Sequence, residues 1–259
     1  GRAIDVDPNG NTYVTGYTVS NDFPVANPFD STYSGGGSAG YDVFVTKLSP
    51  AGDTILYSTY IGGANGNEQA EGLAVADDGS VVLVGSTDSD DFPTESPYQA
   101  TLAGDKDAFV CKLDPTGGLL SFSTYVGGAD SDYATGVELD GSNRPVVAGY
   151  TRSTDFPVVS AFDGSLGGSQ DAIALRLSSD GQSLDYATYY GGTGIDAAFD
   201  LALAADGSPI LCGYTSSTDL PLQSPYDDSF GGGSLGDAFV AHFNVDVSAL
   251  SFASYLGGT

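Results

Sequence analysis

The sequence predicts an all-β fold, a β-propeller built from four four-stranded antiparallel blades. The phrase Thr-x-Ser-x-Asp-Phe-Pro, or a close variant, occurs four times, and the prolines that end it are 69, 64 and 64 residues apart. A fixed period over a whole chain is typical of repeat architectures. Each repeat of ~64 residues holds four short apolar segments between glycine-rich turns, with no helical periodicity, and this pattern is typical of a propeller blade.

The repeats define the predicted blades within a single domain over residues 1–259. The blades span residues 1–63, 64–128, 129–192 and 193–259. The chain opens inside the repeat pattern and has no methionine, which suggests a fragment of a larger protein. Three assemblies remain open at this point: a four-bladed ring, an arc within a longer chain, and a larger ring completed by two chains.

The first two segments of each repeat predict a hairpin. In the first segment apolar residues alternate with period two, as in a β-strand. Its ranges are Ala3–Asp7, Gly72–Ala76, Gly136–Asp140 and Asp200–Ala204. A short turn such as Asn9-Gly10 follows and supplies the positive φ angles of a tight hairpin. The second segment is apolar on both faces, as in a strand between two layers. Its ranges are Thr12–Tyr17, Val81–Ser86, Pro145–Tyr150 and Pro209–Tyr214.

A long connection with the Asp-Phe-Pro phrase separates the second strand from the third. Apolar residues recur in it, so we expect the connection to pack onto the body of the blade. The third strand is predicted at Asp42–Leu48, Asp107–Leu113, Asp171–Leu177 and Asp237–Phe243. The fourth is predicted at Ile55–Tyr60, Leu120–Tyr125, Leu184–Tyr189 and Leu250–Tyr255, and Gly-Gly follows shortly after each.

The composition is strongly acidic, and this argues against some classes of binding partner. The chain has 34 acidic and 7 basic residues, a formal net charge of −27. Such a surface repels phosphate backbones and anionic lipids, so we expect no nucleic-acid partner. No 18-residue apolar run occurs, and we expect no membrane insertion. The acidity is read first as solubility in a salty or extracellular setting. It would also attract Ca²⁺, the one candidate cofactor, because Ca²⁺ prefers oxygen ligands.

The repeated motifs resemble a known family. Residues 10–24 read Gly-Asn-x-Tyr-Val-x-Gly-Tyr-Thr-x-Ser-x-Asp-Phe-Pro, and residues 107–113 read Asp-Ala-Phe-Val-x-Lys-Leu. Together with Ser-Thr-Tyr-x-Gly-Gly at 123–128, these motifs resemble the bacterial β-propeller repeat family, the SBBP repeats. The resemblance implies a large secreted or surface-attached bacterial protein and no established chemistry.

Three acidic positions recur and form the candidate metal site. One lies in the Asp-Phe-Pro phrase, one begins the third strand, and one lies in the Gly-Gly connection. They are Asp22, Asp91, Asp155 and Asp219; Asp42, Asp107, Asp171 and Asp237; and Glu68, Asp132 and Asp196. We expect all three kinds on the long-loop face, where Ca²⁺ collects carboxylates and carbonyls from loops. The competing interpretation, favoured for the Asp-Phe-Pro residues, is a turn in which the carboxylate accepts nearby backbone N–H groups.

Other recurring side chains suggest weaker hypotheses. Tyr17, Tyr150 and Tyr214 end the second strand and are candidates for stacking on a sugar, with aromatic packing as the alternative. The position of Lys47, Lys112, Arg176 and His242 on the third strand is basic in every repeat, which favours a structural ion pair. Both cysteines, Cys111 and Cys212, are expected to be buried and unpaired.

These observations favour a non-enzymatic module, a scaffold or adhesion unit located extracellularly or at the cell surface. No unique catalytic constellation can be assembled from the sequence, so no enzyme activity is predicted. The alternative is a carbohydrate- or ligand-binding propeller that uses the long-loop face and depends on Ca²⁺. The expected partners are other surface proteins or extracellular glycans, and self-association that completes or extends a ring.

Overall fold

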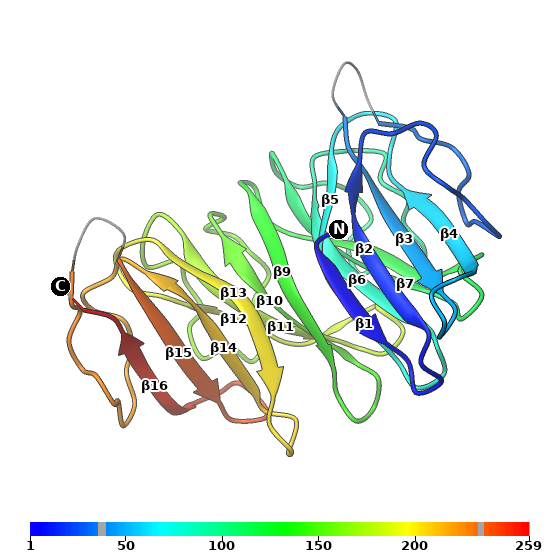
Figure 1. The fold of residues 1–259 in the computed structure, drawn as a ribbon. Coiled ribbons are helices and arrows are strands. Elements are labelled where there is room, and N and C mark those ends of the chain that lie inside the picture. The colour runs from blue at the N-terminus through cyan, green and yellow to red at the C-terminus, as the bar shows by residue number, and fades with distance from the viewer. Residues whose placement is uncertain (36–39, 233–235, 259) are drawn as a thin grey trace. The chain divides into compact units, whose positions relative to one another are not determined.

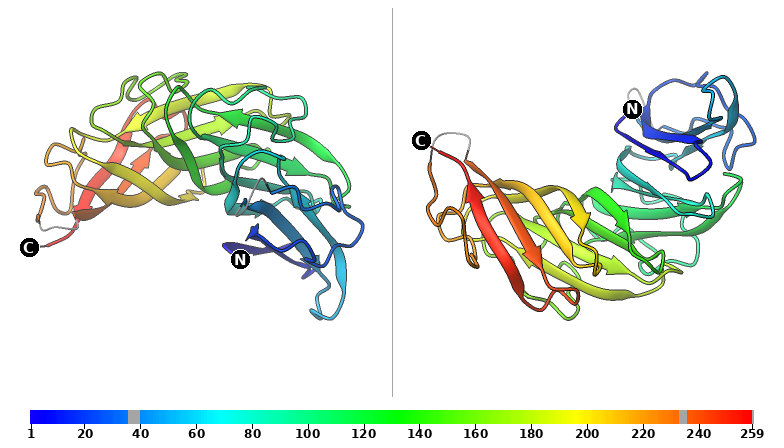
Figure 2. Two further views of the ribbon diagram at one scale, coloured as in Figure 1. Left: turned by 90° about the horizontal axis from the view of Figure 1, so that it is seen from above. Right: turned by 60° about the horizontal axis from the view of Figure 1, so that its bottom comes forward.

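The structure is a computed structural model that describes residues 1–35, 40–232 and 236–258. Within these ranges the chain forms sixteen strands and no helix, arranged as four antiparallel four-stranded sheets. Each repeat forms one sheet whose strands neighbour one another in chain order (Figures 1 and 2). The all-β fold with one four-stranded blade per repeat is therefore confirmed.

The strands of the first two sheets come from the first two repeats. The first sheet contains β1 (Ala3–Val6), β2 (Thr12–Thr18), β3 (Asp42–Leu48) and β4 (Ile55–Ile61). The second contains β5 (Glu68–Val75), β6 (Val81–Thr87), β7 (Asp107–Leu113) and β8 (Leu120–Val126).

The other two sheets follow the same plan. The third contains β9 (Asp132–Leu139), β10 (Pro145–Thr151), β11 (Asp171–Leu177) and β12 (Leu184–Tyr190). The fourth contains β13 (Asp196–Leu203), β14 (Pro209–Thr215), β15 (Asp237–Phe243) and β16 (Leu250–Leu256). The bounds predicted for the third strand of every repeat are confirmed to the residue.

The predicted start of the first strand is wrong in three repeats. Strands β5, β9 and β13 begin four residues earlier than predicted, at Glu68, Asp132 and Asp196. An irregularity in register interrupts each of them, for example between Ala70 and Gly72. Such a bulge breaks the alternation by which a strand is recognised in a sequence. These three acids are therefore strand residues, whereas the prediction placed them in the connections.

The chain divides into two compact units. The first comprises Gly1–Val126 with Asp180–Gln182, and the second comprises Gly127–Ser179 with Ser183–Thr259. The first and second sheets form the core of one unit, and the third and fourth sheets form the core of the other. A single domain over residues 1–259 stays a prediction.

In both units one face of a sheet packs against the next sheet. In the first unit the covered face of the first sheet carries Tyr13, Val43, Val45, Tyr57 and Ile61, all at most 1% exposed. The second sheet meets it with Leu73, Leu83, Phe109, Cys111 and Tyr125. In the second unit the same positions of the third sheet are Val146, Ala148, Ala172, Ala174, Tyr186 and Tyr190. They belong to one core with Leu211, Phe239, Ala241, Ala253 and Tyr255 of the fourth sheet.

The long connection packs along the outer edge of its own sheet, as predicted. In the first repeat Ala26 and Asp30 form β-bridges with Ser58 and Tyr60 of β4. Both bridges recur in the second and third repeats, and the fourth repeat has the first of them, between Gln223 and Ala253. The connection therefore covers a sheet edge that would otherwise expose unpaired backbone groups. Over the described ranges the structure contains no helix that is long and apolar enough to cross a membrane.

Candidate functional site

Two of the predicted metal-site acids meet in the first unit. Asp42 at the start of β3 and Glu68 at the start of β5 are both fully buried. They flank Gly62: a Cβ at this glycine would lie 2.8 Å from the Asp42 Cγ and 2.8 Å from the Glu68 Oε2. Asp42 Oδ2 accepts the Ser34 N–H at 2.8 Å, and Glu68 Oε1 accepts the hydroxyls of Thr87 and Ser89. Among the described residues, the other oxygens, Asp42 Oδ1 and Glu68 Oε2, have no hydrogen-bond partner.

The second unit repeats this arrangement with two aspartates. Asp171 at the start of β11 and Asp196 at the start of β13 are fully buried on either side of Gly191. A Cβ at Gly191 would lie 2.6 Å from the Asp171 Cγ and 2.8 Å from the Asp196 Oδ2. Asp171 accepts the N–H groups of Gly167 and Gly168 at 2.8 and 3.3 Å.

Asp196 is bound by the groups that follow Gly191 and by a serine of the Thr-x-Ser phrase. Its Oδ2 accepts the Gly192 N–H at 2.8 Å and the Ser217 hydroxyl at 2.6 Å, whereas its Oδ1 is buried without a partner. The first glycine of the Gly-Gly phrase is therefore required because any side chain there would occupy the space between the two carboxyl groups. We call these two arrangements, Asp42 with Glu68 and Asp171 with Asp196, the junction acid pairs.

Burial changes the acidity of both pairs. Burial raises the pKa of Glu68 to about 7, and the nearby Asp42 charge adds to the effect. Burial likewise raises the pKa of Asp171 to about 6, with a further contribution from Asp196. Burial also raises the pKa of Asp42, although the hydrogen bond from the Ser34 N–H partly opposes this rise. Since the charged form of a buried carboxyl is disfavoured, each pair favours binding a proton or a cation between its members.

The remaining acids of these two kinds lie at equivalent positions. Asp107 accepts the Ala103 N–H at 2.9 Å and the Gln99 side-chain amide at 2.6 Å. Asp132 accepts the Gly128 N–H at 2.7 Å and the hydroxyls of Thr151 and Ser153. In the fourth repeat Asp237 accepts the Gly231 N–H at 2.6 Å, and its buried Oδ1 has no hydrogen-bond partner among the described residues. The three atoms nearest to the Cβ position of Gly257 all belong to Asp237.

The acids of the Asp-Phe-Pro phrase are exposed and do not join the junction acid pairs in their buried sites. Three of them accept the N–H of the residue that follows Gly-Gly, from 26 or 27 residues upstream. The bonds are Ala64 to Asp91 at 3.0 Å, Ala129 to Asp155 at 2.8 Å and Thr193 to Asp219 at 2.9 Å. Asp22 instead accepts the Ser20 hydroxyl at 2.5 Å. The turn interpretation is therefore wrong for these three acids: their carboxylates accept backbone N–H groups as expected, but from a distant segment and not from their own turn.

The second glycine of Gly-Gly permits this contact. A Cβ at Gly63, Gly128 or Gly192 would lie only 2.3–2.5 Å from the Oδ1 of the bound aspartate. The Thr193 N–H, supported by its hydroxyl, holds the pKa of Asp219 below its ordinary value. The junctions at Gly62–Gly63 and at Gly191–Gly192 are therefore each built from two acids around one glycine and a third acid beside the next glycine.

The junction acid pairs offer oxygen ligands of the kind that Ca²⁺ prefers. Two carboxylates with unpartnered oxygens fit a cation in charge, although Ca²⁺ takes six to eight ligands and would need backbone carbonyls or waters as well. Over the described residues the structure contains no group of three or more His, Cys, Asp or Glu side chains that is placed to hold a metal ion. Calcium binding stays a prediction.

The candidate sugar-stacking tyrosines differ in their surroundings. Tyr150 stacks on Tyr133 with ring centroids 4.6 Å apart and an interplanar angle of 22°. Tyr17 meets Tyr41 edge to face at 5.1 Å. Tyr214 is half-buried beside Gly236. The three side chains therefore share a strand position without sharing an aromatic partner.

The tyrosines at the end of the fourth strand have a defined structural role. The hydroxyls of Tyr60, Tyr125, Tyr189 and Tyr255 each donate to the carbonyl of the serine in the Thr-x-Ser phrase, at 2.8–2.9 Å. The serine side chains of the same phrase bind the junction acids in three repeats. Sequence reasoning missed this role of Ser89, Ser153 and Ser217, although their constant distance from the aspartate of the phrase was a signal.

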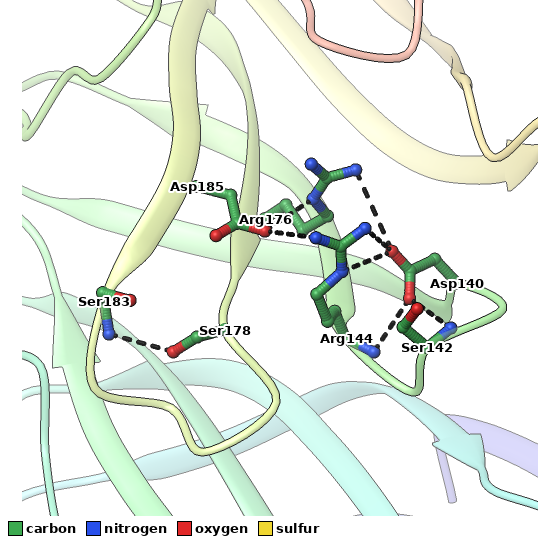
Figure 3. A network of polar contacts seen from close by, with 7 residues as sticks. All are labelled: Asp140, Ser142, Arg144, Arg176, Ser178, Ser183 and Asp185. Atoms are coloured by element: carbon green, nitrogen blue, oxygen red, sulfur yellow. Dashed lines mark hydrogen bonds and ion pairs between the residues drawn. The ribbon is translucent and has the colours of Figure 1, made fainter.

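Third-strand cations pair with carboxylates in two repeats, as predicted. Lys47 Nζ lies 3.7 Å from Asp7 Oδ2. Arg176 Nε donates to Asp185 at 3.1 Å within a larger network that Figure 3 shows. There Arg144 lies between Asp140 at 2.7 Å and Asp185 at 2.8 Å. The network lines a cleft of about 250 Å³ in the second unit.

The fourth repeat departs from this pattern. His242 Nε2 lies 2.8 Å from the Ser208 hydroxyl, and the imidazole meets Phe252 edge to face.

Cys212, predicted to be buried, is exposed, whereas Cys111 is buried as predicted. Cys212 lies on the face of the fourth sheet that corresponds to the covered face of the third, so the repeat pattern alone misassigned its burial.

Comparisons with known proteins bear on the fold and on the first repeat motif. A solved structure similar to this chain is a protein of unknown function from Dyadobacter fermentans DSM 18053, with 12% identity and a TM-score of 0.50. The match covers 98% of this chain and 67% of that one, and it supports the fold alone. No curated protein matches the chain. Residues 1–24 match the family described as SBBP, Beta-propeller repeat. Over residues 1–24 this match confirms the resemblance that the motifs indicated, since this segment is similar to the SBBP β-propeller repeat.

Proposed function

We propose that this chain is a non-enzymatic structural module, a scaffold or adhesion unit of a secreted or cell-surface bacterial protein. One observation carries the proposal: the polar side chains that recur in the repeats bind backbone groups and hydroxyls of their own unit. Catalysis normally requires a unique constellation, whereas these residues perform the same task at successive junctions. The net charge of −27 supports a module that stays soluble in a salty, extracellular setting.

Removing the recurring acids one at a time tests the proposal. Asp91→Ala, Asp155→Ala and Asp219→Ala should each lower the free energy of unfolding by a similar amount, because each loses an equivalent backbone contact. Binding to extracellular proteins and glycans, measured on arrays, should not change for one repeat alone. If one substitution abolishes binding of a ligand and leaves stability intact, that aspartate belongs to a binding site and the structural proposal fails at that position.

Glycan binding is the second candidate function. The observation in its favour is the stack of Tyr150 on Tyr133 at a half-buried position, since aromatic rings can pack against sugar rings. A glycan array probed with the wild-type chain and with Tyr150→Ala tests it. Tyr17→Ala is the matched control, because Tyr17 has the same strand position and only an edge-to-face neighbour. Equal binding by the two variants would exclude the stack as the site.

We also propose that Ca²⁺ binds at the junction acid pairs and stabilises the units. The unpartnered oxygens of Asp42 and Glu68 support this assignment. A ligand that binds only the folded state raises stability by mass action, by about 2.7 kcal/mol at a hundredfold excess over Kd. Calorimetry at pH 8 should show saturable binding of CaCl₂ that Glu68→Gln weakens. An equal rise in melting temperature from NaCl at matched ionic strength, without binding heat, would exclude the site and leave the scaffold proposal intact.

A further inference from the structure

The first repeat places a lysine and an asparagine side chain against one carboxylate oxygen. Lys47 on β3 lies with its Nζ 3.7 Å from Asp7 Oδ2, and the side-chain amide of Asn11 donates to the same oxygen at 2.7 Å. Asp7 is 5% exposed and Lys47 is 9% exposed. The Lys47 ammonium also lies over the ring of Tyr13, 4.8 Å from its centroid. An amine, a carboxylate and a primary amide therefore meet in a site that is largely shielded from water.

The backbone brings the side chains of Asn11 and Lys47 to the same place on the first sheet. Tyr13 pairs with Lys47 across β2 and β3, and Asn11 lies two residues before Tyr13, so the side chains share one side of the sheet. In the fourth repeat the side chains at these two positions are Ser208 and His242, and their Oγ and Nε2 atoms lie 2.8 Å apart. The two positions are therefore close enough for direct contact.

The third repeat shows the same convergence on the equivalent carboxylate (Figure 3). Arg144 and Arg176 occupy the positions of Asn11 and Lys47, and they lie 2.7 and 3.9 Å from Asp140 Oδ2. A guanidinium keeps its proton and has no amide carbon, so these residues form ion pairs and nothing more. A lysine amine, in contrast, is a nucleophile once it loses a proton, and its flexible stem lets it approach a neighbouring group.

We propose that Lys47 and Asn11 form an isopeptide bond, with Asp7 as the group that transfers the protons. The Asp7 carboxylate takes a proton from the Lys47 ammonium, and the neutral amine attacks the Asn11 Cγ. A bond forms between Lys47 Nζ and Asn11 Cγ, and the bond between Asn11 Cγ and Nδ2 breaks. The two protons that Nζ gives up pass to Nδ2, which leaves as ammonium. The step requires no oxidant and no further reactant.

Asp7 Oδ2 suits this role because it contacts both nitrogen atoms that exchange protons. Burial tends to raise the pKa of Asp7, but hydrogen bonds from Asn11 and Asn9 outweigh burial and hold the pKa below its ordinary value. Such a carboxylate is a weak base, so the proton transfer is unfavourable and the reaction is slow. One turnover is enough for each chain, because the ammonium diffuses away and the new bond stays.

Mass spectrometry of the full chain, fresh and after prolonged warming, is the test. The wild-type chain should become lighter than its sequence by the mass of one ammonia molecule. Protease digestion should then yield a branched peptide that joins the segments around Asn11 and Lys47. Lys47→Arg and Asn11→Ser should each abolish the mass deficit and the branched peptide. A wild-type chain that keeps its full mass in both samples overturns the proposal.

The variants are chosen so that they fold. Arginine stands at the Lys47 position in the third repeat, and serine stands at the Asn11 position in the second and fourth repeats. Lys112→Arg is the matched control, because this lysine of the second repeat has Ala76 and Ser80 in place of the acid and the amide. Lys112→Arg should keep the mass deficit. Melting curves establish that each variant is folded before its mass is compared.

Asn9→Ala separates the isopeptide bond from another loss of ammonia. Asn9 precedes Gly10, and an Asn-Gly pair can cyclise to a succinimide with the same change in mass. Asn9→Ala should keep both the deficit and the branched peptide. If the deficit disappears with Asn9→Ala and no branched peptide is found in the wild type, the proposal is wrong. Asp7→Ala should slow formation of the bond by about tenfold or more, and formation at the wild-type rate would contradict the role of Asp7.

Discussion

The third and fourth repeats, which share the second unit, have the same internal bonds and different surroundings. Tyr189 and Tyr255 donate to Ser153 and Ser217 in the same way, at 2.8 and 2.9 Å. The third repeat, however, ends in a junction where Asp171 faces an acid of the following strand across a glycine. In the fourth repeat only Asp237 atoms are nearest to the equivalent glycine. The recurring phrases thus fix each blade internally, and the junction depends on the first strand of the next repeat.

Glycine substitution at the two junctions should show the largest difference. Gly192 and Gly258 are the second glycines of their Gly-Gly phrases, but a Cβ at Gly192 would lie 2.4 Å from Asp219 Oδ1 and 2.7 Å from Ser217 Cβ. Among the described residues, a Cβ at Gly258 would meet nothing within 4 Å. Gly192→Ala should therefore lower the free energy of unfolding by about 2 kcal/mol, as overpacking does, and Gly258→Ala should be nearly neutral. Equal losses in urea unfolding would contradict the proposed difference between the junctions.

Removal of the third-strand basic group should lower the free energy of unfolding more in the third repeat than in the fourth. The expected difference is smaller than for the glycine substitutions. Arg176 is part of a network with Asp140 and Asp185, and its side chain is 12% exposed. Arg176→Met leaves these carboxylates with fewer partners and should cost about 1–2 kcal/mol of unfolding free energy. His242 has a hydroxyl partner, so His242→Met should change stability by less than about 0.5 kcal/mol. Thermal unfolding in low and high salt provides the measurement, and a larger loss for His242→Met than for Arg176→Met would refute the assignment.

The Asp-Phe-Pro aspartates should show the smallest effect and no difference between the repeats. Asp155 and Asp219 are both exposed and each accepts one backbone N–H at 2.8–2.9 Å. Asp155→Ala and Asp219→Ala should each cost about 1 kcal/mol, because the N–H group left behind can bond to water. Matched chemical unfolding of the two variants checks this. A loss confined to one of them would mean that the phrase has different roles in the two repeats.

Much of the fold could be predicted because the repeats report the same structure four times. Turn residues and alternation placed the second, third and fourth strands within one residue of their observed bounds. The first strand was misplaced because a bulge interrupts its period at positions such as Ala70 to Gly72. Burial could not be predicted from alignment alone: Cys212 is aligned with core positions, yet it lies on an uncovered face.

The sequence identified the residues of the candidate site, but it could not predict how they pair. The three acidic positions were found because they recur, but their shared face was inferred and the pairing across Gly62 and Gly191 was not. A sequence places Asp171 and Asp196 25 positions apart and says nothing of which oxygen faces which. The network of Arg144 and Asp185 was missed because it occurs in one repeat alone, so no periodic signal marked it.

The pH dependence of unfolding tests most directly whether the junction acids are a buried structural pair. The folded pKa of Asp171 is raised from 3.8 to about 6, so its neutral form adds stability that is fully present below about pH 4 and is lost as the pH rises through 6. In metal-free buffer Asp171→Asn should abolish this loss, about 2–3 kcal/mol between pH 4 and pH 8, because the amide stays neutral and can donate to Asp196. Curves for wild type and Asp171→Asn that run parallel from pH 4 to pH 8 would contradict the account.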